Sequence, residues 1–300
     1  ELKNRNFYVS IDSHNTDELI RGSKAGADYL LSIKSETYHI LENLDSYPIL
    51  IPTDNDITEF YKLIDRALDD ELIFIADPIL DPISYGFTDS LVRYVNLREK
   101  YPDIHIMMGL GNITELTHAD TSGINMIMLG IIEELKLNHI LTTQVSRHCS
   151  TVIRETDLAR RIIHAASENN LTPKHINDGL LVHHGHKDYA FCSDELIEMQ
   201  GSIKDKNYRI YVNDDGIHLF NKNVYKIFSD PFDFYEHLEV SDDAGHAFYL
   251  GVELARAQIA HQLQKEYQQD EELSWGCLVD KKVDNKLQSK ELGTTFKKRN

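Results

Sequence analysis

Short apolar runs alternate with helical patterns along the first half of the chain. Each run is rich in β-branched or aliphatic residues, is too short for a helix, and is followed by a segment with helical periodicity. The runs are residues 7–11, 29–33, 48–52, 72–76, 104–108 and 139–143. Because strands that alternate with helices form parallel sheets, we expect one sheet in which all strands point the same way.

Most of these strands end in a polar or glycine-rich cluster. The polar residues at the strand ends are Asp12, Lys34, Asp54, Asp77, Asn112 and Gln144. A barrel would gather them on one rim, whereas an open doubly wound sheet would separate them along a crevice. In residues 72–87, LIFIADPILDPISYGF, a carboxylate follows a buried strand and rigid loop residues come next, which is typical of an active-site loop. The alternative is that Asp77 and Asp81 cap a turn or the next helix, since Asp-Pro pairs favour turns.

The pattern changes after Pro173. Residues 207–221 alternate around an Asp-Asp-Gly turn and predict a hairpin, and residues 244–268 predict a long helix. The predicted domains are an α/β portion over residues 1–177, an α+β appendage over residues 178–280, and a mobile polar tail over residues 281–300.

Composition limits the classes of function. A formal net charge of -18 argues against nucleic-acid binding, which requires a basic surface. The three cysteines show no CxxC pattern, which favours a reducing, cytoplasmic location and gives no zinc signature. No apolar run is long enough for a transmembrane helix. The histidines in LVHHGH, residues 181–186, are interpreted as a surface cluster because neighbours on a strand face opposite ways, so no metal site is predicted.

Several motifs point to one family. VSIDS at residues 9–13, AGADYLLSI at residues 25–33 and ADPILDPISYGF at residues 76–87 resemble motifs of the dihydropteroate synthase family. The middle of the chain, the helix AFYLGVELARAQIA and the motif LSWG at residues 273–276 resemble its branch associated with tetrahydromethanopterin biosynthesis. The resemblance covers roughly residues 8–276.

The resemblance implies a fold and a reaction. The fold would be a TIM-type (β/α) barrel of the pterin-binding kind, with six of its eight strands in this chain, followed by the α+β appendage. The reaction would condense a dihydropterin-methyl diphosphate with an arylamine, forming a C–N bond and releasing diphosphate. Magnesium would accompany the diphosphate, no tightly bound cofactor is expected, and a homodimer is an allowed assembly.

The resemblance also implies roles for individual residues. Asp12 and Asp77 match the family's aspartates that bind the pterin ring. A carboxylate can accept hydrogen bonds from the N–H groups of that ring. Asp77, Asn112 and Arg147 are the predicted catalytic residues. The further predicted ligand-binding residues are Ser32, Lys34, Asp81, Asn112, Gln144 and His148.

Departures from the family pattern keep other functions open. Leu31 stands where the family has a pterin-binding asparagine, and GLGN at residues 109–112 replaces a motif that carries a lysine. The basic candidates near the site are Lys34, Arg147 and His148. One alternative is therefore a non-catalytic pterin-binding or assembly protein. Another is an enzyme that transfers a methyl group from a methylated pterin to a corrinoid protein.

Overall fold

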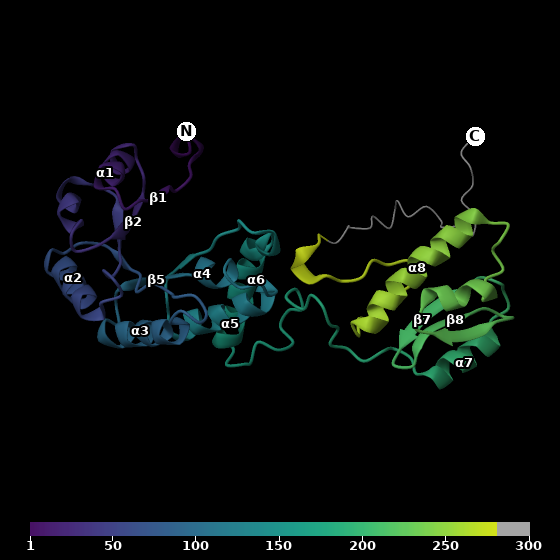
Figure 1. The fold of residues 1–300 in the computed structure, drawn as a ribbon. Helices are drawn as coiled ribbons and strands as arrows, with labels where there is room; N and C mark the ends of the chain where they lie inside the picture. The colour runs from purple at the N-terminus through teal and green to yellow at the C-terminus, as the bar shows by residue number, and fades with distance from the viewer. Residues whose placement is uncertain (281–300) are drawn as a thin grey trace. The chain divides into compact units, whose positions relative to one another are not determined.

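The computed structural model describes residues 1–280, apart from the side chain of Asn43. The chain divides into two compact units, Glu1–Leu180 and Leu181–Asn300. The first contains a curled sheet with helices and the second a smaller sheet with a long helix (Figure 1). Each unit has its own hydrophobic core.

The first unit is built on parallel strands that follow one another in chain order. They are β1 (Ser10–Asp12), β2 (Tyr29–Ile33), β3 (Tyr47–Leu50), β4 (Ile75–Ala76), β5 (His105–Gly109) and β6 (His139–Leu141). Each is hydrogen-bonded to the next, in the order β1-β2-β3-β4-β5-β6. Their carboxyl ends therefore lie at one edge of the sheet, as the alternation of strands and helices predicts.

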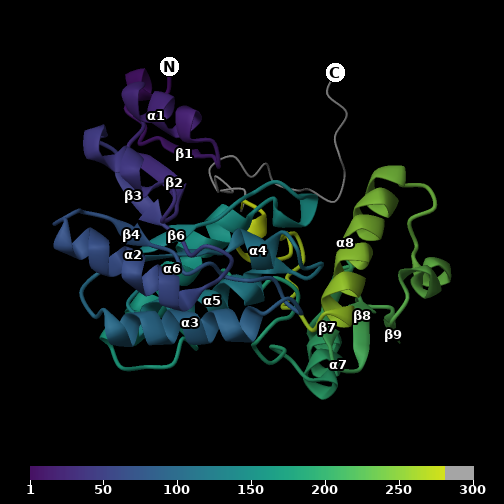
Figure 2. The same ribbon diagram turned by 60° about the vertical axis from the view of Figure 1, so that its left-hand side comes forward.

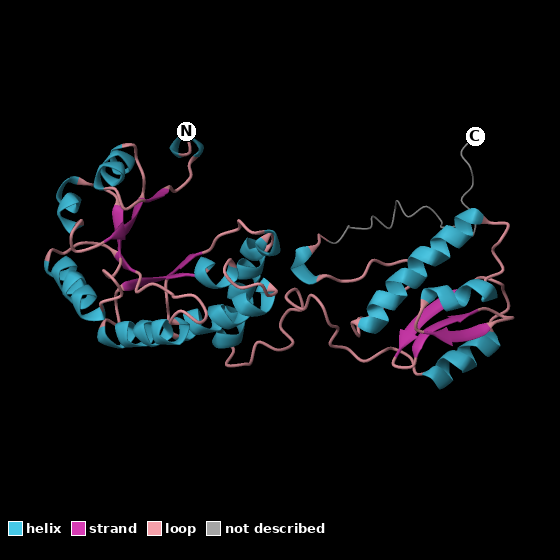
Figure 3. Ribbon diagram, viewed as in Figure 1, coloured by secondary structure: helices cyan, strands magenta, loops and turns pink. Residues whose placement is uncertain are grey.

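Helices connect the strands and lie along the convex side of the curled sheet (Figures 2 and 3). The longer ones are α1 (Thr16–Lys24), α2 (Ile57–Asp69), α3 (Phe87–Lys100), α5 (Thr121–Glu134) and α6 (Val152–Glu168). The short elements are η1 (Lys3–Arg5), η2 (Tyr38–Asn43), α4 (Gly111–Thr114) and η3 (Arg147–Cys149). Polar caps set some of the starts: the side chain of Asn15 accepts the first free N–H groups of α1, and Asp56 does the same for α2.

The expected TIM-type barrel is wrong. Within the described residues β1 pairs only with β2 and β6 only with β5, so both are edge strands and the sheet stays open. Closing a barrel requires enough tilted, staggered strands for the first to reach the last. Here β4 contributes only Ile75–Ala76 to the middle of the sheet. The first unit is therefore an open, curled, six-stranded parallel α/β sheet.

The two faces of this sheet are packed differently. On the convex face, strand residues such as Leu30, Leu50 and Ile106 join the helices in the main core. Residues that alternate with them form a separate small cluster on the concave face, as expected for strands whose successive side chains point to opposite sides. We call this cluster the concave floor; it consists of Tyr29, Leu31, Ile49, Ile75 and Met107.

Arg98, near the end of α3, joins three parts of the first unit. Its guanidinium donates to the carbonyls of Leu135 at 2.9 Å and Lys136 at 3.0 Å, just beyond α5. It also donates to the carbonyls of Pro102 at 2.7 Å and Ile104 at 3.0 Å, which lead into β5. A planar cation with several N–H donors suits the unpaired carbonyls at a helix end. One side chain thus fixes how α3, α5 and β5 meet.

The second unit contains a three-stranded antiparallel sheet and α8 (Ala244–Gln262). The strands are β7 (Arg209–Asn213), β8 (Gly216–Phe220) and β9 (Tyr225–Phe228), and the other elements are α7 (Ser193–Ser202), η4 (Pro231–His237) and η5 (Gly276–Leu278). The predicted hairpin is confirmed: β7 and β8 pair across the Asp214-Asp215 turn. The predicted helix begins at residue 244 but ends at Gln262, earlier than the pattern indicated.

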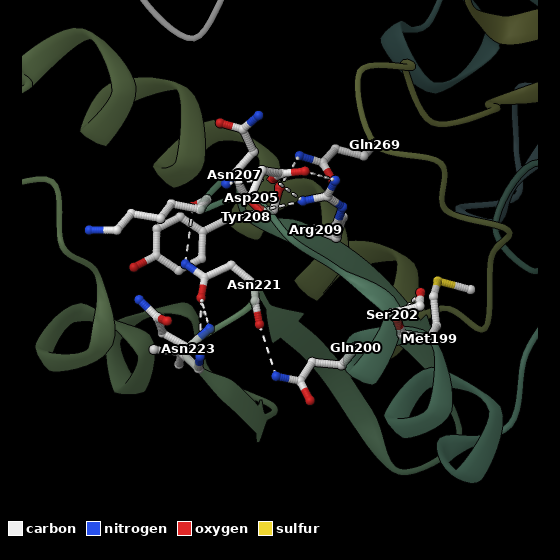
Figure 4. A network of polar contacts seen from close by, with 12 residues as sticks. Met199, Gln200, Ser202, Asp205, Asn207, Tyr208, Arg209, Asn221, Asn223 and Gln269 are labelled. Atoms are coloured by element: carbon white, nitrogen blue, oxygen red, sulfur yellow. Dashed lines mark hydrogen bonds and ion pairs between the residues drawn. The ribbon is translucent and has the colours of Figure 1, made fainter.

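A polar network closes the open end of the β7–β8 hairpin (Figure 4). The buried amide of Asn221 accepts the N–H groups of Asn223 and Val224 and donates to the carbonyl of Lys206 at 3.1 Å. The backbone carbonyl of Asn221 accepts from the side chain of Gln200 at 3.0 Å, which ties α7 to the sheet. These bonds satisfy backbone groups that the turn would otherwise bury unpaired.

The motif LSWG is held by a buried lysine. Only 4% of Lys265 is exposed, and its ammonium donates to the carbonyls of Val182 and Ser274. The same ammonium lies 4.5 Å from the centre of the Trp275 ring. Burial lowers the pKa of Lys265. The carbonyls and the ring replace the water that a lysine normally keeps, so this side chain fastens the segment after α8.

None of the helices in residues 1–280 is both long and apolar enough to cross a membrane.

We predict that Arg98→Met destabilises the first unit by about 2 kcal/mol, because carbonyls of two half-buried residues, Ile104 and Leu135, lose a charged donor. Arg98→Lys should recover only part of this, since a single ammonium cannot span both sets of carbonyls. The measurement is urea unfolding followed by circular dichroism. Arg160→Met is the control, because that arginine is largely exposed and should change stability by under about 0.5 kcal/mol. Equal midpoints for Arg98→Met and the control would contradict the role given to Arg98.

Candidate functional site

The loop after β4 begins at Asp77, a buried carboxylate. Its Oδ1 accepts the backbone N–H of Ile79 at 2.9 Å and the hydroxyl of Tyr94, from α3, at 2.9 Å. The Asp77 N–H donates to the carbonyl of Leu50 at 2.8 Å, so the carboxylate continues the line of β4. The predicted turn-capping role of Asp77 is therefore confirmed, and it uses one carboxylate oxygen, Oδ1.

Burial makes the Asp77 charge costly. It raises the pKa of the Asp77 carboxyl to about 6, against the opposing effects of the Ile79 N–H, the Tyr94 hydroxyl and the Arg93 guanidinium. Burial and the neighbouring carboxylate also raise the pKa of Tyr94, so its hydroxyl stays protonated and donates. A carboxyl that titrates near pH 6 at the end of a buried strand is a common feature of functional sites.

Arg93 clamps the same loop from α3. Its guanidinium donates to the carbonyls of Pro78 at 3.2 Å and Ile79 at 2.7 Å, and it forms a 2.7 Å ion pair with Asp81. Only 14% of the Arg93 side chain and 15% of the Asp81 side chain are exposed. Ile79 has a φ of 62°, a region that β-branched residues rarely adopt, so the clamp holds a strained backbone in place.

Asn112 supports this loop from the other side. It lies in α4, and its Nδ2 donates to the carbonyl of Leu80 at 2.7 Å. Together with the Arg93 bonds, this gives three successive loop carbonyls a side-chain donor. The predicted catalytic residue Asn112 is therefore part of the predicted site, but its side chain binds the backbone of the Asp77 loop.

The ends of β1 and β2 bring two more predicted residues together. The Ser32 hydroxyl donates to Oδ1 of Asp12 at 2.7 Å. Ser32 has a φ of 70°, and the register of β2 against β3 shifts between Leu30 and Ile33. An irregularity of this kind turns a side chain to the other face of a sheet. Here it places Ser32 beside Asp12, and Ile33 in the main core.

Asp12 and Asp77 lie at the same edge of the sheet. Asp12 is in register with Leu31, a residue of the concave floor. Asp77 follows Ala76, the last residue of β4, and its Oδ1 accepts from Tyr94, a main-core residue of α3, so Asp77 lies at the carboxyl edge of the sheet. Both carboxylates therefore lie at the carboxyl edge of the sheet, where the concave floor ends.

The loop after β6 is tied to α4. Glu115 accepts the backbone N–H groups of Val145 and Ser146, each at 2.8 Å. The Ser146 hydroxyl, followed by these two N–H groups, lowers the pKa of Glu115 to about 2. His148 lies 3.0 Å from the carbonyl of Thr114. The basic ring of His148 is thus used to fasten the loop.

The remaining predicted residues have no structural partner that explains them. Lys34 is half-buried at the end of β2, and Gln144 and Arg147 are exposed in the loop after β6. The structure gives their side chains no hydrogen bond or ion pair within residues 1–280. Sequence reasoning missed Arg93, Tyr94 and Glu115. The sequence could have indicated Tyr94, because it lies on the apolar face of α3. The hydrophobic pattern contains no comparable indication for Arg93 or Glu115.

No set of three or more histidine, cysteine, aspartate or glutamate side chains is arranged to hold a metal ion within residues 1–280.

Comparisons with known proteins add little about function. No family model matches the chain. It is 29% identical to an uncharacterized protein of Methanocaldococcus jannaschii over 312 residues, covering 88% of this chain and 58% of that protein. The chain thus spans little more than half of that relative's length. A solved structure of a Chromobacterium violaceum protein, described as a spore coat polysaccharide biosynthesis protein E, matches 67% of this chain and 57% of its own. Its TM-score of 0.43 and 11% identity support no inference.

We predict that Asp77→Asn stabilises the protein at pH 8 and changes little at pH 4. The folded pKa of about 6 lies above the unfolded value near 3.9, so the acid form favours the fold and stability falls as pH rises between them. The asparagine Oδ1 can still accept from Ile79 and Tyr94. The gain at pH 8 should be about 3 kcal/mol at most, or several degrees in melting temperature.

The measurement is the melting temperature of both proteins between pH 4 and pH 8. Asp69→Asn, at an exposed position near the end of α2, is the matched control and should leave the profile unchanged. Parallel profiles for Asp77→Asn and the unchanged protein would show that the buried charge has no such cost.

Proposed function

We propose that Asp12 and Asp77 bind a pterin ring at the concave edge of the six-stranded sheet. The observation that carries this proposal is the pair of carboxylates at one edge of the sheet, where the concave floor ends. A flat heteroaromatic ring needs an apolar surface for its face and acceptors for its N–H groups, and this edge offers both.

Each carboxylate keeps one oxygen for a ligand. In Asp77 the Oδ1 atom is taken by Ile79 and Tyr94, and in Asp12 the Oδ1 atom is taken by Ser32. The structure shows no partner within residues 1–280 for either Oδ2 atom. The bonds at Oδ1 fix the orientation of the carboxyl groups, so Oδ2 of each is preorganised to accept an N–H of the aminopyrimidine edge.

The reaction proposed for this site is condensation of a dihydropterin-methyl diphosphate with an arylamine, in tetrahydromethanopterin biosynthesis. The amine nitrogen forms a bond to the pterin methylene carbon as the bond from that carbon to the diphosphate oxygen breaks. The leaving diphosphate needs cationic partners, which Lys34 and magnesium would supply. The expected location is the cytoplasm, in keeping with the cysteine content.

A second candidate is a pterin-binding protein without catalytic activity. Two specific observations favour it: Asn112 donates to the carbonyl of Leu80, and His148 lies at hydrogen-bond distance from the carbonyl of Thr114. Both side chains hold loops instead of facing a leaving group. In this reading the ring-binding edge is intact, and the cations left for a leaving group are Lys34 and Arg147.

We predict that pterin-6-carboxylate binds saturably to the protein at pH 7.5 and at least tenfold more weakly to Asp77→Asn. The substitution replaces the accepting Oδ2 with a donating NH₂ group, and loss of one charged hydrogen bond corresponds to about tenfold in affinity. Affinity for the unchanged protein should also fall below pH 6, where Asp77 becomes protonated. Isothermal titration calorimetry measures both.

The Asp77→Asn variant is its own folding control, because its expected gain in melting temperature excludes misfolding as the cause of weak binding. Asp69→Asn should bind like the unchanged protein. Absence of saturable binding to the unchanged protein, or equal binding by Asp77→Asn, would refute the proposed ring site.

We predict that the protein releases diphosphate from a dihydropterin-methyl diphosphate only when an arylamine and magnesium are present. Lys34→Met should abolish release and leave pterin binding within about twofold, because the lysine is assigned to the leaving group. A coupled diphosphate assay measures release. Pterin binding without any release in the unchanged protein would decide for the second candidate.

A further inference from the structure

The second unit contains a cavity of about 420 Å³ beside β7. Three segments line it: residues 188–191, residues 210–212 of β7, and residues 266–269 after α8. It belongs entirely to the second unit and shares no residue with the proposed pterin site. A volume of this size fits a small ring compound.

The backbone of β7 presents unpaired groups to this cavity. The N–H of Ile210 donates to Oε1 of Gln269 at 3.0 Å, so Ile210 faces away from β8. In an antiparallel strand the N–H and C=O of one residue point to the same side, and every second residue points its groups to that same side. The carbonyl of Ile210 and the N–H of Val212 therefore also face away from β8. No described residue supplies a partner for these two groups, and both residues line the cavity.

Gln269 already acts as a planar amide paired with this edge. Besides accepting from Ile210, its Nε2 lies 3.3 Å from the carbonyl of Tyr208 and 2.9 Å from the hydroxyl of Tyr249. Figure 4 shows Gln269 beside Tyr208 and Arg209, where β7 begins. Gln269 thus pairs with the first outward-facing groups of β7 and leaves the carbonyl of Ile210 and both the N–H and the carbonyl of Val212 beyond it. These unpaired backbone groups are too few to bind an added strand, but they match the donor and acceptor on one edge of a heterocycle.

Aromatic side chains form the walls of the cavity. The rings of Phe191 and Tyr211 meet edge to face at 5.6 Å. Tyr267 is fixed because its hydroxyl donates to the buried carboxylate of Glu253 at 2.8 Å. Rings held in place in this way offer surfaces on which a flat ligand can stack at low entropic cost.

The charges of the cavity disfavour anionic ligands. Asp188 and Glu266 line it, and within residues 1–280 the cation paired with them is Lys187, 3.2 Å from Glu266. Both carboxylates are exposed to solvent, so they repel a phosphate or carboxylate only moderately, whereas a neutral ligand meets no such repulsion. The ligand chemistry that fits is neutral.

We infer that this cavity binds a neutral, flat, nucleobase-like heterocycle that carries an N–H donor next to a ring acceptor. The donor pairs with the carbonyl of Ile210, the ring acceptor receives the N–H of Val212, and the faces of the ring stack between aromatic side chains. The inference does not depend on the proposed pterin site, because its contacts lie in the other unit.

The test is calorimetric titration of adenosine, guanosine and N6,N6-dimethyladenosine into the full chain. At least one of adenosine and guanosine should bind saturably, and N6,N6-dimethyladenosine should bind about tenfold more weakly than adenosine, since it lacks the N–H donor. Val212→Pro should cause a loss of similar size, because proline has no N–H, and an outward-facing position on an edge strand tolerates it. Val212→Ala is the matched control: it keeps the N–H and should retain affinity within about threefold.

Three results would overturn the inference. They are no binding of adenosine or guanosine at millimolar concentration, equal binding of the dimethylated analogue, and unchanged affinity in Val212→Pro. If Val212→Pro does not fold, the comparison of adenosine with N6,N6-dimethyladenosine, made on the unchanged protein, decides the question. Binding that is lost in Asp77→Asn and kept in Val212→Pro would place the nucleoside in the first unit and also count against this cavity.

Discussion

The first unit depends on a carboxylate that the fold holds in an unfavourable place. Asp77 is buried at the end of β4, where its charge is expensive, and the surroundings compensate with the N–H of Ile79, the hydroxyl of Tyr94 and the field of Arg93. These groups come from the loop and from α3, so the position of the helix is coupled to the charge. The strained backbone at Ile79 belongs to the same arrangement. Such a combination is maintained only when neighbouring structure enforces it.

Sequence patterns predicted the order of elements well and the closure of the sheet badly. Apolar runs identify strands because burial on both faces leaves a continuous signature, and the Asp-Asp-Gly turn identified the β7–β8 hairpin. Whether six parallel strands close depends on tilt and stagger, which side-chain periodicity does not record. The motif resemblance suggested a barrel, yet β1 and β6 remain edges of an open sheet within the described residues.

The candidate site shows a similar division. Polar residues at strand ends could be located from sequence, because parallel strands bring their carboxyl ends to one edge. The sequence could not show which of those residues remain available to bind a ligand, because that depends on the path of the loops. In the structure Asn112 and His148 contact backbone carbonyls. The irregularity that turns Ser32 toward Asp12 was equally hidden, because a serine with positive φ has no sequence signature.

The sequential order of the strands has a consequence for how the chain folds. Each strand of the first unit pairs with the strand that precedes it in the chain, so pairing never waits for a distant segment. Loop-closure entropy stays small at every step, and contacts remain local for a parallel sheet. Synthesis on the ribosome proceeds from the amino terminus, so the sheet can grow strand by strand as the chain emerges. Its advancing edge is then exposed only until the next strand arrives.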